Sequence, residues 1–212
     1  MTTCRQIRNH STILPATGIR GLALVAACMT RYEAWPICAS LLVLALAVLL
    51  RRQMPPRSAV VAVARLASYP AVAIVLFLLN SRWTVGAWFV SSGFFVAENE
   101  SLGHPLVAWD QVREGVYRLS GPAVVWPAYA AAALVVWTFA RSRARASLVL
   151  VLALAAAAAL PWYAYVEGHP FRIRYGVPLV VACAAIVGTG IGLLPRRLRA
   201  IAAGLVVAGA LW

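Results

Sequence analysis

The residues of this chain best suited to bind an anion lie in one short polar stretch, Glu-Gly-His-Pro-Phe-Arg-Ile-Arg-Tyr at positions 167–175. Only 12% of the 212 residues are charged, yet this stretch holds a carboxylate, an imidazole and two guanidiniums. In an extended backbone Arg172 and Arg174 point to the same side, and each guanidinium offers a planar fork of donors that suits phosphate or carboxylate. The stretch predicts an anion-binding loop at a membrane surface, for example for the phosphate of a lipid-linked donor. The alternative is a connecting loop whose arginines touch lipid headgroups.

The composition is that of a membrane protein with several spans. Hydrophobic residues make up 63% of the chain, and the mean hydropathy is +0.82, far above that of soluble globular proteins. The formal charge of +13 comes from 19 basic residues, all arginine, which are scattered between apolar segments. Because they form no basic face with interleaved aromatic residues, binding to nucleic acid is not expected. The four cysteines show neither metal-ligand spacing nor a disulfide pattern.

The apolar segments predict an all-α fold, a polytopic bundle of six or seven transmembrane helices in one domain covering residues 1–212. Most segments approach the roughly 20 residues that a helix needs to cross a bilayer, whereas the last one is shorter and is expected to end within a span. Pro170 and Pro178 separate the two spans on either side of the polar stretch. The expected spans are 13–30, 34–50, 58–80, 121–140, 146–166, 176–194 and 200–212, with one external loop at 81–120.

The distribution of arginine predicts how the chain is oriented. The N-terminal tail and the loops at 51–57, 141–145 and 195–199 hold 11 arginines and no acidic residue. The loops between them hold six arginines and all six acidic residues of the protein. By the positive-inside rule the N-terminus lies in the cytoplasm. Since the absence of lysine and the Ala/Val/Leu/Arg bias favour a bacterial source, the expected location is the plasma (inner) membrane, with the mixed-charge loops outside.

The long external loop carries carboxylates suited to acid–base chemistry. Glu98, Glu100 and Asp110 are candidates for a general base that deprotonates an incoming hydroxyl, or for ligands of a divalent cation. The alternative for each is a solvated loop residue. The external histidines His104 and His169 lack metal-ligand spacing, so no zinc site is expected and no cofactor is predicted. A run of aromatic residues that precedes the carboxylates is predicted to pack in the core or at the membrane interface: Trp83, Trp88, Phe89, Phe94 and Phe95.

Two features inside the apolar segments concern helix packing and transport. The sequence Gly-Thr-Gly-Ile-Gly at 188–192 predicts a small-residue contact between helices, of the GxxxG kind. Arg20 and Arg65 are charged residues inside spans, where they are costly unless they reach the interface or face a polar interior. A transporter needs a polar pathway through the helices, and these two arginines with a few hydroxyl residues are the groups available to form one.

Two stretches of the chain resemble bacterial GT-C type multi-span glycosyltransferases, relatives of the protein O-mannosyltransferases and aminoarabinose transferases. They are Arg-Tyr-Glu-Ala-Trp-Pro at 31–36, after a span rich in small residues, and the 167–175 stretch followed by Gly-Val-Pro. The resemblance extends over most of the chain as the middle and later spans of such an enzyme. It implies transfer of a sugar from a polyprenyl-phosphate donor on the extracytoplasmic face.

In such a reaction a carboxylate deprotonates the acceptor, and cationic groups stabilise the departing lipid phosphate. The resemblance implies that Glu33 lies at the same membrane face and joins Glu98, Glu100 and Asp110 as a weak catalytic candidate. The implied substrate-binding residues are Arg172, Arg174, Tyr175, His169 and Arg31.

The chain departs from this family in its first external loop. The family carries its key acidic residue in a large loop directly after the first span, whereas the first external loop here covers only about residues 31–33. The chain is therefore expected to be a fragment that lacks the N-terminal catalytic part and is inactive alone. The competing hypothesis is a non-enzymatic integral membrane protein that binds lipid headgroups or supports a membrane complex. The sugar, the acceptor and any protein partner stay open.

Overall fold

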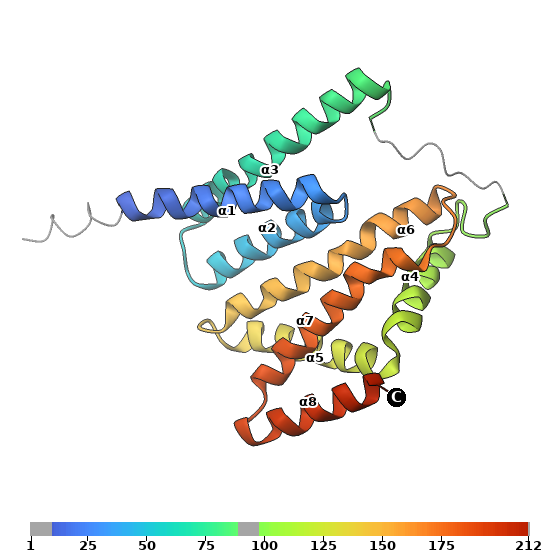
Figure 1. The fold of residues 1–212 in the computed structure, drawn as a ribbon. Helices are drawn as coiled ribbons and strands as arrows, with labels where there is room; N and C mark the ends of the chain where they lie inside the picture. Colours follow the sequence, from blue (N-terminus) through green and yellow to red (C-terminus); the bar gives the residue numbers. More distant parts are fainter. Residues whose placement is uncertain (1–9, 89–97, 212) are drawn as a thin grey trace, which may run out of the picture.

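The computed structural model describes residues 10–88 and 98–211, and these ranges are built from helices (Figure 1), which confirms the all-α prediction. The 3-10 helix η2 runs directly into α6, so that the two form one continuous helical segment. The elements are α1 (His10–Thr30), α2 (Ala34–Arg51), α3 (Pro56–Val85), α4 (Pro105–Ser120), α5 (Pro122–Arg141), η2 (Ala146–Ala158), α6 (Ala159–Val166), η3 (Ile173–Gly176), α7 (Val177–Leu193) and α8 (Arg196–Leu211).

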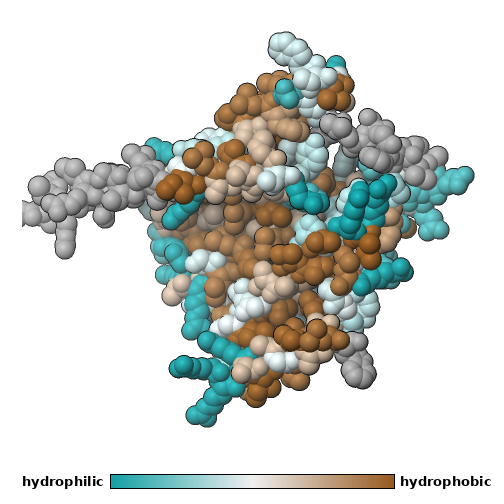
Figure 2. Space-filling view, viewed as in Figure 1, coloured by the Kyte–Doolittle hydropathy of each residue, from teal (hydrophilic) through white to brown (hydrophobic). Residues whose placement is uncertain are grey.

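Within the described ranges, five helical segments are long and apolar enough to cross a membrane: 34–51, 56–85, 122–141, 146–166 and 173–193. Figure 2 shows hydrophobic residues across the middle of the visible face and hydrophilic residues toward its left and right ends. This is the architecture of a multi-pass integral membrane protein. The expected count of six or seven spans is not confirmed, because the apolar part of α1 and the whole of α8 are shorter than these five segments.

Helix α8 nevertheless runs back along α5 over most of the thickness of the bundle. A Cβ atom added to Gly209, near the end of α8, would lie 2.7 Å from the Cβ of Ala123 in the first turn of α5. At 1.5 Å per residue the 16 residues of α8 extend about 24 Å, compared with the roughly 30 Å of a bilayer core. The last apolar run therefore packs on the bundle as a helix slightly shorter than a full span.

Two parts of the segment expected to be one external loop, 81–120, are helical. Helix α3 continues to Val85 and ends at Gly86, whose φ of 77° is the left-handed conformation that commonly closes a helix. Helix α4 then occupies residues 105–120, so this part of the expected loop is a helix, and its external position stays a prediction. Its buried residues Ala108, Val112 and Val116 recur every four positions, whereas its charged residues are exposed. An amphipathic helix of this kind lacks the continuous apolar run by which spans are recognised.

Small residues bring α7 close to α5, as the sequence predicts. The glycine at the contact is Gly190, however, and not one of the GxxxG pair Gly188 and Gly192. A Cβ atom on Gly190 would lie 3.0 Å from the Cα of Ala131 and would overlap the Cβ of the same residue. Gly188 and Gly192 have nothing within 4 Å of such an atom. The contact between the two helices is therefore made by the central glycine of 188–192, and the GxxxG pair faces away from α5.

The loops gather at two ends of the bundle (Figure 1). We call residues 51–57, 141–147 and 194–199 the basic end. There the Arg51 guanidinium donates hydrogen bonds to the carbonyl oxygens of Phe139 and Ala140, and Arg52 Nη2 donates to Ser147 Oγ at 2.7 Å. We call residues 31–33, 98–104 and 167–176 the mixed-charge end. The grouping follows the alternation of arginine along the sequence.

Candidate functional site

The 167–176 loop begins where α6 is closed by a glycine. Gly168 has a φ of 87°, and its backbone N–H donates to the carbonyl oxygen of Tyr165 at 3.0 Å. The N–H of His169 reaches back to the carbonyl oxygen of Ala164 at 2.9 Å. This pair of hydrogen bonds is a Schellman motif, in which glycine adopts the left-handed conformation at low cost. Pro170 then prevents the helix from continuing, so the loop starts at a defined point and direction.

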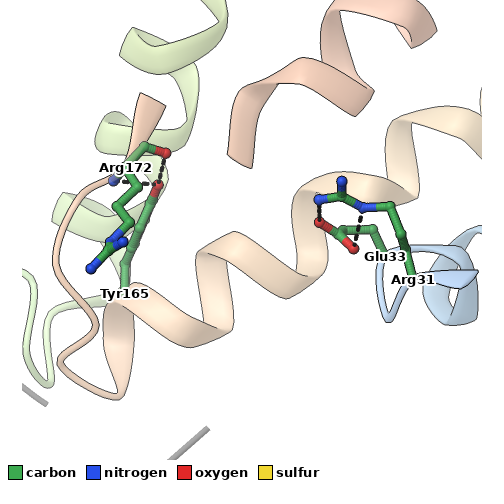
Figure 3. Close-up of polar contacts among 4 residues, drawn as sticks. All are labelled: Arg31, Glu33, Tyr165 and Arg172. Carbon is green, nitrogen blue, oxygen red and sulfur yellow. Dashed lines mark hydrogen bonds and ion pairs between the residues drawn. The ribbon is translucent and has the colours of Figure 1, made fainter. Parts of the chain in front are cut away.

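Tyr165, at the end of α6, supports the middle of this loop through hydrogen bonds to its backbone. Its side chain is buried, with 2% of its surface exposed. Its hydroxyl donates to the carbonyl oxygen of Arg172 at 3.2 Å and accepts from the backbone N–H of the same residue at 3.4 Å (Figure 3). The ring centroid lies 5.8 Å from that of Phe171 and 6.4 Å from that of Tyr175. Tyr165 therefore fixes the backbone that carries the loop arginines, a role for which its position at the end of an apolar run gives no clear signal.

The two loop arginines do not point to one side, and the expectation of an extended run is wrong. Arg172 has extended dihedral angles, but the next residues form the single turn η3, closed by a hydrogen bond from the Tyr175 N–H to the Arg172 carbonyl at 3.0 Å. In a turn of about three residues the side chains two positions apart diverge. Arg172 is half-buried, whereas Arg174 is exposed, with its guanidinium 5.7 Å from the centroid of the Tyr175 ring.

The loop packs tightly on α4. A Cβ atom on Gly176 would lie 3.4 Å from the carbonyl carbon of Gly115, so the two backbones approach directly. The space between them is lined by Gln111, Arg172 and other residues, and it holds no room for a water molecule. Within the described ranges, Gln111 Oε1 is a buried polar atom without a hydrogen-bond partner. The exposed side of the loop, where Arg174 lies, is therefore its accessible side.

The turn at 98–101 is attached to the same loop. Asn99 Nδ2 donates to the carbonyl oxygen of His169 at 2.5 Å, and Asn99 Oδ1 lies 2.9 Å from the Ser101 hydroxyl. That hydroxyl, which is buried, also lies 3.0 Å from the carbonyl oxygen of Tyr165. Glu98 and Glu100 flank Asn99 and are both exposed. The structure therefore brings two of the candidate carboxylates to the loop that carries the candidate arginines.

Arg31 and Glu33 form a two-pronged ion pair at the same end, between α1 and α2 (Figure 3). Arg31 Nη2 lies 2.6 Å from Glu33 Oε1, and Arg31 Nε lies 3.2 Å from Oε2. The Glu33 side chain is 10% exposed, whereas that of Arg31 is 60% exposed. The hydrogen bonds from Arg31 hold the pKa of the Glu33 carboxyl below its ordinary value. An engaged carboxylate with a lowered pKa is a weak base, so Glu33 is better suited to position Arg31 than to accept a proton.

A weak charge interaction and a shared hydrophobic cluster relate this part of the chain to the loop. The hydrogen bond and the charge of Glu33 raise the pKa of Arg31, and the nearby Tyr175 hydroxyl raises it further. Ile37, one turn into α2, and Tyr175 both pack on the hydrophobic cluster beneath the loop. The start of α2 and the loop therefore share one hydrophobic cluster, and Arg31 interacts with Tyr175 only weakly through charge. The buried core of this cluster is Ala108, Val112, Val116, Val125, Ala157, Ala158, Tyr165 and Leu179.

Because Glu33 has a lowered pKa in the folded chain, its ion pair stabilises the protein above pH 4.5, and this contribution is lost as the pH falls through the folded pKa. We expect Arg31→Gln to lower Tm at pH 7 and to flatten the decline of Tm on acidification below pH 4.5. Arg113→Gln is the matched control, because Arg113 and its partner Asp110 are both largely exposed. Thermal unfolding in detergent across this pH range measures both variants. An unchanged slope in Arg31→Gln would contradict the assigned role.

Other predicted site residues lie apart from this group. Asp110 is on the exposed face of α4, with its carboxylate 3.1 Å from Arg113 Nη2. Trp83 and Trp88 are exposed, Trp83 at 92%, so neither is part of the core. The predictions for Phe89, Phe94 and Phe95 fall outside the described residues. Within the described ranges, no cluster of three or more His, Cys, Asp or Glu side chains is placed to hold a metal ion.

Comparisons of this chain with models of known families, with curated proteins and with solved structures gave no match.

Proposed function

We propose that this integral membrane protein binds the phosphate of a polyprenyl-phosphate-linked sugar at its mixed-charge end. The observation that supports this most is the setting of Arg174. Its guanidinium is exposed at the junction of two apolar spans, on a loop that Tyr165, the glycine closure of α6 and the contact with α4 hold in place. A loop backbone that is already held in place loses little further entropy when its arginine binds a phosphate. Arg172, Arg31, His169 and Tyr175 are the neighbouring residues proposed to complete the site.

The activity proposed for this arrangement is sugar transfer of the glycosyltransferase kind. The hydroxyl of the acceptor loses its proton to Glu98 or Glu100, and its oxygen forms a bond to the anomeric carbon of the sugar. The bond from that carbon to the phosphate oxygen breaks, and the lipid phosphate leaves with the bonding electrons. The arginines then stabilise the charge that develops on the phosphate. The attachment of the 98–101 turn to the loop, through Asn99 and His169, supports pairing these carboxylates with the arginines.

The second candidate function is binding without catalysis, in which the loop holds the phosphate of a lipid headgroup. Two observations favour it. The carboxylate of Glu33 is occupied by Arg31, and the space under the loop is filled. Neither the surroundings of Glu33 nor the space under the loop therefore offers an enclosed cavity for a sugar acceptor. The two functions share the phosphate site and differ in what Glu98 and Glu100 do.

We expect Arg174→Gln to weaken binding of polyprenyl phosphate by about tenfold, the value of one charge-assisted hydrogen bond of about 1.5 kcal/mol. The double change with Arg172→Gln is expected to weaken it further. Scintillation proximity binding of radiolabelled polyprenyl phosphate to the purified chain in nanodiscs measures both. Arg113→Gln is the control, because it removes an exposed arginine on α4 and leaves the loop intact. Unchanged affinity in a folded double variant would contradict the proposal.

A second readout separates transfer from binding alone. If the chain is a transferase, the change of Glu98 and Glu100 to glutamine keeps the affinity for polyprenyl phosphate and abolishes its release from a sugar-charged donor. If the unaltered chain binds the lipid and releases none, the non-enzymatic function is correct.

A further inference from the structure

The basic end of the bundle contains a pocket of about 580 Å3 between the start of η2 and the corner that joins α7 to α8. We call it the basic pocket. One wall includes Arg145, Ser147 and Leu148, and the opposite wall includes Leu194, Arg196 and Arg199. Its volume is that of pockets that bind small molecules. The basic pocket and the 167–176 loop lie at opposite ends of the helices, so a ligand in the pocket is independent of the proposed function.

The charged residues that line this pocket are all positive. Three guanidiniums line it, and Arg52 adds a fourth beside it by donating to the hydroxyl of the lining Ser147 at 2.7 Å. The ion pairs of the described residues all lie elsewhere, at Arg31, Arg113 and Arg118. The basic end, residues 51–57, 141–147 and 194–199, contains no acidic residue. The positive charge is therefore not neutralised by this chain, and an anion in the pocket relieves the repulsion among the arginines.

The guanidiniums of the pocket also have free donors. Arg199 uses its Nε to donate to the carbonyl oxygen of Leu194 at 2.9 Å, which fixes the side chain and leaves both terminal nitrogens for a ligand. Among the described residues, the side chains of Arg145 and Arg196 have no hydrogen-bond or ionic partner, and both are exposed. Several forked donors around one space suit the oxygen atoms of a phosphate.

We propose that the basic pocket binds the phosphate of an anionic phospholipid headgroup. The position at the end of the apolar helices is the level at which headgroups lie in a bilayer. Leu148 and Leu194 in the walls suit the glycerol backbone that follows the phosphate. If the basic end faces the cytoplasm, as the arginine distribution predicts, it also faces a leaflet whose anionic lipids attract basic residues. The bound lipid would join η2 to the α7–α8 corner, since the pocket takes its residues from both.

The test measures the affinity of the full chain in detergent for phosphatidylglycerol by native mass spectrometry, with phosphatidylcholine as the zwitterionic reference. We expect the double variant Arg145→Gln, Arg196→Gln to bind phosphatidylglycerol about 25-fold more weakly, about fivefold for each arginine near the membrane surface. Binding of phosphatidylcholine is expected to be weak in both proteins. Arg143→Gln is the matched control, because it lies in the same loop, is exposed and does not line the pocket.

The outcomes distinguish specific binding in the basic pocket from a general attraction of anionic lipids to a basic surface. An equal loss in Arg143→Gln, or no loss in the double variant, would overturn the proposal, provided that size-exclusion profiles and Tm show folded protein. Competition with millimolar inorganic phosphate identifies the source of the ligand. Retention of phosphatidylglycerol under competition supports a headgroup site, whereas complete displacement would assign the pocket to free phosphate and would overturn the lipid assignment.

Discussion

Tyr165→Ala is expected to cost about 3 kcal/mol of folding stability, the lower part of the range for truncating a buried aromatic side chain. The residue is 2% exposed and packs among the largest hydrophobic cluster of the described residues. Its removal leaves a cavity beneath the 167–176 loop and frees the backbone of Arg172 from the hydroxyl that bonds to both its N–H and its carbonyl oxygen. We therefore expect binding of polyprenyl phosphate to be lost together with stability.

Tyr165→Phe separates these two effects. It keeps the ring and its contacts with Phe171 and Tyr175, and it removes the hydroxyl, at an expected cost of about 1 kcal/mol. Chemical unfolding in detergent gives the stability of both variants, and the binding assay gives the affinity. If Tyr165 positions the loop, the phenylalanine variant binds more weakly than the loss of stability explains. Equal affinity in the phenylalanine variant and the unaltered chain would contradict this role.

The second large effect is expected at the contact between α5 and α7. Gly190→Leu is expected to destabilise the fold by about 3 kcal/mol, because even a Cβ atom at this position overlaps Ala131 and reaches to 3.0 Å from its Cα. Backbone atoms give way less easily than a flexible side chain, so the two helices must separate. Thermal unfolding in detergent, followed by circular dichroism, measures the loss.

Gly188→Leu and Gly192→Leu are the matched controls. They place the same side chain on the same helix at positions with open space around them. Because leucine favours a helix more than glycine does, these controls are expected to be neutral or slightly stabilising. Equal destabilisation at all three positions would mean that α7 packs through the GxxxG pair as well, and the observed orientation of α7 would be wrong.

The spans could be predicted from the sequence because a membrane helix needs a long apolar run, and five such runs are present in the described ranges. Helix α4 could not, because its apolar residues recur every four positions among charged ones, and a segment of that composition beside a membrane is equally compatible with a loop. The stop of α6 at residues 167–170 was readable from Gly168 and Pro170. The apolar runs and the glycine and proline at the end of α6 are local sequence features, and the structure has the helices and the helix end that they indicate.

The sequence suggests which residues could form the candidate site, but it does not predict how they are arranged. The sequence grouped Arg31 with Tyr175, and a site shared by these two residues stays a prediction. It placed Arg172 and Arg174 on one side, whereas the approach of Gly176 to Gly115 turns the backbone into η3 and separates them. That approach depends on α4, which the sequence did not reveal as a helix. Tyr165 was missed for the same reason, since its partners are backbone atoms of a loop whose path is set by tertiary packing.

Both proposals depend on the two ends of the bundle facing opposite sides of one membrane. Single-cysteine variants test this directly. Glu167→Cys reports on the mixed-charge end and Arg143→Cys on the basic end, since both positions are exposed; the background replaces Cys4, Cys28, Cys38 and Cys183 with alanine. A membrane-impermeant maleimide is applied to intact cells and to lysed cells. The account predicts that the position 167 variant is labelled in intact cells and that the position 143 variant is labelled only after lysis. Labelling of both variants from the same side would contradict it.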